Sequence, residues 1–66
     1  MVRYIIVEKT RGFSITSVDI KGNYSMGYYG KAKQWRSYTG AVIALNRIIA
    51  INSIGASVLK IKRITI

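Results

Sequence analysis

The segment that most constrains the fold is an apolar run at residues 37–53, which reads SYTGAVIALNRIIAINS. At 3.6 residues per turn, this run places one apolar stripe along a single helical face. The stripe consists of Tyr38, Ala41, Val42, Leu45, Ile48, Ile49 and Asn52. Ser37 or Thr39 can cap the first turn, because a side-chain hydroxyl accepts a hydrogen bond from an unpaired backbone amide. Gly55 suits the left-handed position that commonly ends a helix. The sequence therefore predicts a helix over residues 37–53.

The opposite side of this helix is also partly apolar. Ile43, Ala50 and Ile51 lie among Asn46 and Arg47, where a surface helix normally carries more charge. One interpretation is that a neighbouring strand or loop covers this strip, and the other is a helix-to-helix contact in a homodimer. A chain of 66 residues buries only about 60% of its unfolded surface, so self-association would add to a small core. We therefore predict a homodimer with Ile43, Ala50 and Ile51 at its interface.

The remainder of the chain alternates as strands do. Residues 2–10 are apolar on both faces, which predicts a central strand. Gly12 can take the positive φ of a tight turn, and residues 13–20 follow as a second strand. The apolar residues of that strand are out of phase, so we expect a bulge near Thr16 or Ser17.

A second turn at residues 21–23 leads to a third strand over residues 24–29. Gly27 and Gly30 weaken this strand, which suits a bent or edge position. After the helix, residues 57–66 alternate as a last strand, with Lys60 and Lys62 on one face. The order β-β-β-α-β predicts one small α+β domain over residues 1–66, in which an antiparallel sheet is covered on one face by a single helix.

The residue inventory argues against catalysis and metal binding. The chain has no cysteine and no histidine, which removes disulfides, thiolate chemistry and the usual zinc ligands. Glu8 and Asp19 are the only acids, and a paired-carboxylate mechanism needs two that lie close together. Their distances from the turn at Gly12 do not match, so we expect each acid to pair with a cation. The spacing of a phosphate-binding loop is absent as well. We therefore expect no enzyme, no cofactor and no bound metal.

Charge gives the strongest indication of a partner. Eleven lysines and arginines against two acids give a net charge of +9, a field that attracts polyanions. Half of the residues are nonetheless apolar, so the charge lies on a folded body rather than on a disordered tail. Residues 21–36 hold four cations and no acid, and residues 60–66 hold three.

Aromatic residues are interspersed with the first of these basic segments. Aromatic rings can stack on bases for about 1–3 kcal/mol each, while neighbouring cations neutralise phosphates. The alternative interpretation is that Tyr24, Tyr28 and Trp35 pack beneath the helix and the lysines are solvated. We predict a non-catalytic protein, with a regulatory role as one option, that binds DNA or RNA with low sequence specificity. The predicted interface consists of Lys31, Lys33, Trp35, Arg36, Tyr28, Tyr29, Lys60, Lys62 and Arg63.

Two other functions fit the same composition. A small basic protein of phage or mobile-element type could inhibit a host protein by binding its acidic surface. A peripheral membrane protein is the second alternative, in which the amphipathic helix lies on a surface of anionic lipid. A membrane span over residues 41–59 is disfavoured, because a central arginine such as Arg47 costs about 2.5–3.5 kcal/mol on insertion. No secretory signal follows Met1, which predicts a cytoplasmic location.

Overall fold

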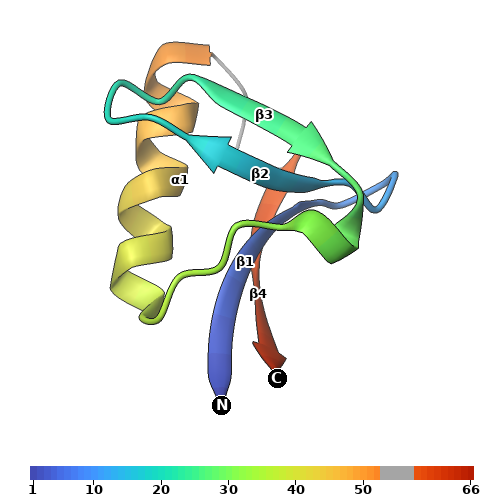
Figure 1. The fold of residues 1–66 in the computed structure, drawn as a ribbon. Coiled ribbons are helices and arrows are strands. Elements are labelled where there is room, and N and C mark those ends of the chain that lie inside the picture. Colours follow the sequence, from blue (N-terminus) through green and yellow to red (C-terminus); the bar gives the residue numbers. More distant parts are fainter. Residues whose placement is uncertain (53–57) are drawn as a thin grey trace.

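A computed structural model describes residues 1–52 and 58–66 of the chain. Its elements are β1 (Val2–Glu8), β2 (Ser14–Val18), β3 (Tyr24–Gly27), a 3₁₀ turn η1 (Tyr29–Lys31), α1 (Tyr38–Asn52) and β4 (Leu59–Thr65). The strands form one antiparallel sheet in the order β3-β2-β1-β4, and α1 lies along one side of it (Figure 1). The predicted α+β fold is confirmed. The predicted helix end at Gly55 lies outside the described residues.

The central strand is β1, as its two apolar faces predict. It pairs with β4 along its whole length, from Val2 opposite Thr65 to Glu8 opposite Leu59. Its ladder with β2 contains one described pair, Val7 opposite Ser14. Farther along, β2 diverges from β1, and the chain that enters the helix takes its place. Trp35 and Tyr4 exchange two backbone hydrogen bonds there, of 2.8 and 2.9 Å.

Both hairpin turns contain a glycine with positive φ, Gly12 at 74° and Gly22 at 99°. In β2 the pairing register shifts between Ile15 and Ser17, which confirms the predicted bulge. The extra residue changes the side-chain alternation, so Ile15 and Val18 both pack on the core that faces α1. Edge strand β3 ends at Gly27, two residues before the predicted end, because the chain turns into η1, which contains Gly30.

The core lies between α1 and the sheet. Its buried members come from α1 and from strands β1, β2 and β4. They are Ile6, Ile15, Ala44, Ile48 and Leu59. Ser37 caps the helix, because its hydroxyl accepts a hydrogen bond from the Gly40 amide at 3.1 Å. Only part of the predicted stripe is correct, since Tyr38 is 58% exposed and Ala44 is buried instead. Small side chains at positions 41 and 44 let the helix approach the sheet, while the ring of Tyr38 packs edge-on against that of Tyr4.

Candidate nucleic-acid interface

The pairing of β1 with β4 determines which cations share a face. Residues opposite one another in an antiparallel ladder direct their side chains to the same side. Ile6 lies opposite Ile61 on the side that faces α1. The alternate positions therefore lie on the other side, which we call the outer face. It carries Arg3, Lys60 and Lys62 together with Ile5 and Val7.

An aromatic ring from a distant part of the sequence meets these cations. The Lys62 ammonium lies 4.9 Å from the ring centroid of Tyr29, which places η1 on the outer face. In Figure 1, η1 and α1 accordingly lie on either side of β1. Tyr29 remains 43% exposed and the preceding Tyr28 is 77% exposed, with its ring edge-on to Phe13. The two basic segments of the sequence thus come together here.

The outer face of β1 is buried, like the side that faces α1. Ile5 is fully buried and Val7 is 5% exposed, although α1 lies on the opposite side of the strand. Lys60 and Lys62 are paired across the ladder with these two residues, and both lysines are exposed. Lys31 ends η1 and is exposed as well. We call this set the basic face, and its members are Arg3, Tyr28, Tyr29, Lys31, Lys60 and Lys62.

Four residues of the predicted interface lie elsewhere. Trp35 is half-buried against the core on the helix side, and the Lys33 ammonium lies 5.6 Å from its ring centroid. Arg63 is opposite Tyr4 in the ladder, so its side chain also points to the helix side. Arg36 is exposed in the loop just before α1. The structure therefore separates Lys33, Trp35, Arg36 and Arg63 from the basic face.

Sequence reasoning missed Arg3. It is half-buried on the outer face, and its guanidinium donates a hydrogen bond to the Val2 carbonyl at 3.0 Å. Arg3, Ile5 and Val7 are alternate residues of one strand, and their side chains therefore share a face. This alternation is the sequence signal that could have revealed Arg3. That signal becomes informative only when the register against β4 is known.

Neither acid lies among these cations. Glu8 is 6% exposed and faces the helix side, where its carboxylate accepts hydrogen bonds from Thr10 and from the Arg11 amide and guanidinium. The ion pair with Arg11 is 2.9 Å long, which confirms the expected cation partner. The Arg11 side chain, followed by the Thr10 hydroxyl, holds the pKa of Glu8 below its usual value, and partial burial opposes this shift.

Asp19 has a different role from the expected one. Its carboxylate accepts hydrogen bonds from the amides of Lys21, Gly22 and Asn23 at 2.9 Å and from the Asn23 side chain at 3.0 Å. Among the described residues these amides take the place of the predicted cation. The Asn23 side chain is the main cause of a lowered pKa at Asp19. The carboxylate thus stabilises the β2–β3 turn.

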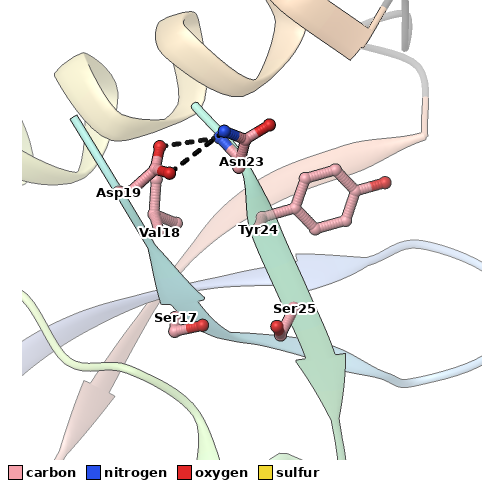
Figure 2. Close-up of a pocket in the computed structure, with 6 residues that line it drawn as sticks. All are labelled: Ser17, Val18, Asp19, Asn23, Tyr24 and Ser25. Atoms are coloured by element: carbon pink, nitrogen blue, oxygen red, sulfur yellow. Dashed lines mark hydrogen bonds between the residues drawn. The ribbon is translucent and has the colours of Figure 1, made fainter. Parts of the chain in front are cut away.

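A depression of about 340 Å³ adjoins this turn. Figure 2 shows Asp19 and Asn23 facing each other across the hairpin, with Ser17 and Ser25 side by side on the two strands. The residues that line it contribute a carboxylate and no cation. Its chemistry therefore does not suit a phosphate group.

Comparison with protein-family models, with curated proteins and with solved structures gives no match for this chain. Within residues 1–52 and 58–66, no three potential metal ligands are grouped together. No helix in the described part of the chain is both long and apolar enough to cross a membrane.

Proposed function

We propose that this protein binds DNA or RNA with low sequence specificity, without catalysis, through the basic face. The observation that carries the proposal is the contact of Tyr29 with Lys62, which joins the two basic segments around an exposed ring. Because Tyr29 is 43% exposed, we expect part of its ring to be accessible for a base to stack on. Lys60 and Lys62 lie two residues apart on one side of β4, and we expect them to contact neighbouring phosphates.

The cations of this face are available to a polyanion. Among the described residues, Arg11 forms an ion pair with Glu8, and no residue of the basic face takes part in it. Binding would release counterions from the nucleic acid, so affinity should fall as salt rises. Each phosphate neutralised contributes about 0.7–0.9 to the slope of log affinity against log salt.

The test is a salt series of binding to short single-stranded and double-stranded oligonucleotides, followed by fluorescence anisotropy of the labelled oligonucleotide. Replacing both Lys60 and Lys62 by glutamine should reduce the salt slope by about 1.4–1.8 if both contact phosphate. The matched control replaces Lys21 and Arg47 by glutamine, which removes the same charge away from the basic face. This control should keep the wild-type slope.

A third variant separates stacking from charge. Tyr29→Leu keeps an apolar side chain but removes the aromatic ring. The binding free energy should therefore weaken by about 1–3 kcal/mol, with little change in the slope of log affinity against log salt. Trp35 emission should stay nearly constant during oligonucleotide binding, because Trp35 lies on the helix side.

The same experiment distinguishes the alternative partners. An inhibitor of an acidic host protein would also lose affinity with salt, but it would show one saturating stoichiometry and no dependence on oligonucleotide length. Absence of oligonucleotide binding below about 10⁻⁴ M at physiological salt would remove the nucleic-acid proposal.

A further inference from the structure

A second candidate surface lies on the helix side of the sheet, opposite the side that carries the basic face. It is an open cleft of about 160 Å³ between α1, the end of β2 and the segment that leads into the helix. Trp35 forms part of its wall, and Ile20 and Ile43 lie along it with exposed fractions of 81% and 47%. Large aliphatic side chains that remain this exposed beside a concave site are typical of a binding surface.

The cleft carries two cations that form no ion pair in the described part of the chain. Lys33 and Arg47 line it, and neither forms an ion pair among the described residues. Asp19 also lines the cleft, but its carboxylate is occupied by the amides of the β2–β3 turn. The two cations therefore exceed the one acid, and the acid has little capacity to accept further hydrogen bonds.

The size of the cleft limits its occupant. Sites for small-molecule ligands typically measure about 300–1,000 Å³. A cleft of about 160 Å³ is smaller and suits a single large side chain. A lipid surface is broad and flat, so it would meet the rim and leave the concavity empty. These considerations favour a side chain that projects from a protein segment.

A second copy of this chain is a poor occupant. Ile43, Arg47 and Ile51 follow one another at four-residue intervals, so Arg47 lies in the middle of the exposed strip. In a two-fold contact through this strip, each copy presents the same residues to the other. Two Arg47 guanidiniums would then approach each other, and neither has an ion-pair partner among the described residues. The positive charge of Lys33 and Arg47 favours a negatively charged partner.

We propose that this cleft binds an acidic segment of another protein, with one large apolar side chain inserted beside Trp35 and flanking carboxylates paired with Lys33 and Arg47. Aromatic and arginine residues at the centre of a contact commonly dominate its affinity. The surface is separate from the basic face, so this interaction does not depend on nucleic-acid binding.

The probe is a capped heptapeptide with three glutamates on each side of a phenylalanine, titrated into ¹⁵N-labelled protein. A second peptide has alanine in place of the phenylalanine. The phenylalanine peptide should shift the amide signals of Ile43 and Arg47 and the indole signal of Trp35. The alanine peptide should bind at least about tenfold more weakly, because it lacks the side chain that fills the cleft.

Two double variants with equal charge changes test whether the peptide binds in the cleft or on the basic face. Replacing Lys33 and Arg47 by glutamate should weaken the phenylalanine peptide by at least about tenfold. Replacing Lys60 and Lys62 by glutamate should leave its indole shift and most of its affinity intact. Ile43→Ala favours the helix and removes one side of the cleft, so it should also weaken binding if the first variant fails to fold.

Several results would overturn the inference. These are equal affinity for the two peptides, equal weakening by both double variants, and no indole shift at about 1 mM peptide. Phosphatidylserine vesicles that bind through Lys33 and Arg47 more tightly than the peptide would assign the surface to a membrane. Sedimentation that shows a homodimer broken by Arg47→Glu would assign it to a second copy.

Discussion

Ser14 is completely buried in β2, yet its hydroxyl has no hydrogen-bond partner among the described residues. A buried polar group without a partner costs about 1–3 kcal/mol relative to a satisfied one. Its position opposite Val7 places the hydroxyl in the apolar layer beneath the outer face. This residue is a local source of instability in a small domain.

We expect Ser14→Ala to raise the free energy of unfolding by about 1 kcal/mol, because alanine removes the unpaired hydroxyl and leaves a small gap. Urea denaturation measures the change. Ser25→Ala is the control, since Ser25 is exposed and its replacement should alter stability by less than about 0.5 kcal/mol. Clear destabilisation by Ser14→Ala would show that the hydroxyl has a partner, such as a bound water.

Glu8 makes stability depend on pH. Its folded-state pKa is lowered from a usual value of 4.5, chiefly by the Arg11 side chain. The unfolded chain therefore binds a proton more readily than the folded one. This contribution is present above about pH 4.5 and is lost as pH falls through the lower folded-state pKa.

We expect the urea midpoint to fall between pH 5 and pH 2.5 and Glu8→Gln to reduce that fall. Glu8→Gln should also lower the midpoint at pH 7, where the carboxylate is charged and paired with Arg11. Asp19→Asn should retain the Glu8 part of the pH response, because the Asp19 carboxylate lies at the other turn. A pH response unchanged by Glu8→Gln would contradict this assignment.

At the scale of elements, the two hairpin turns differ in their surroundings. Gly12 and Gly22 both have positive φ, but a Cβ at Gly12 would meet open space. A Cβ at Gly22 would overlap the carbonyl oxygen of Arg47 in α1. The Asn52 side chain also donates a hydrogen bond of 3.0 Å to the Gly22 carbonyl. The β2–β3 turn is therefore fitted closely against the helix.

The matched pair Gly12→Ala and Gly22→Ala measures this fit. Gly12→Ala should cost about 1–2 kcal/mol, the strain of a left-handed conformation alone. Gly22→Ala should cost more than about 3 kcal/mol, because the helix backbone must also move. Denaturation of the two variants gives the difference, and equal losses would mean that α1 and the turn are not in contact.

Sequence patterns predicted those elements whose signals are local. Gly12, the turn at residues 21–23 and the phase change near Thr16 or Ser17 predicted the turns and the bulge, because each acts through the conformation of a few neighbouring residues. The buried side of α1 was predicted only in part, because apolar residues surround the helix and form more than one stripe. The choice of Ala44 over Tyr38 depends on how closely the helix approaches the sheet.

The candidate site was predicted only in part. Sequence proximity joined Trp35 and Lys33 to Tyr29, but Trp35 pairs with Tyr4 and turns to the helix side. That bridge forms because β2 diverges from β1, which is a property of the sheet and leaves no mark in a short sequence window. The contact of Tyr29 with Lys62 likewise depends on the register of strands that are far apart in the chain.

The whole molecule combines a net charge of +9 with a single ion pair among its described residues. Like charges confined to a small folded body repel one another, and dissolved salt screens that repulsion. Folding brings Lys60 and Lys62 of β4 onto the same face as Arg3 of β1, which lies opposite Ile64, and this concentrates the effect on the outer face.

We therefore expect sodium chloride between about 0.05 and 0.5 M to raise the urea midpoint. Replacing Lys60 and Lys62 by glutamine should reduce this salt response, because the basic face then keeps Arg3 and Lys31 as its cations. Replacing Lys21 and Arg47 by glutamine provides the comparison with the same net charge. A midpoint that falls with salt would mean that favourable charge contacts exceed the repulsion.

The long ladder of β1 with β4 has a consequence for how the chain reaches its fold. Its partners, such as Ile6 and Ile61, are separated by most of the sequence, whereas both hairpins close over short turns. Pairings of this kind form late, since a large loop must close before they contribute. During synthesis, Ile5, Ile6 and Val7 emerge before β4 and must wait for that strand. Until then one edge of the most apolar strand is open to wrong partners, and mutual repulsion between highly cationic nascent chains would help to keep that edge from aggregating.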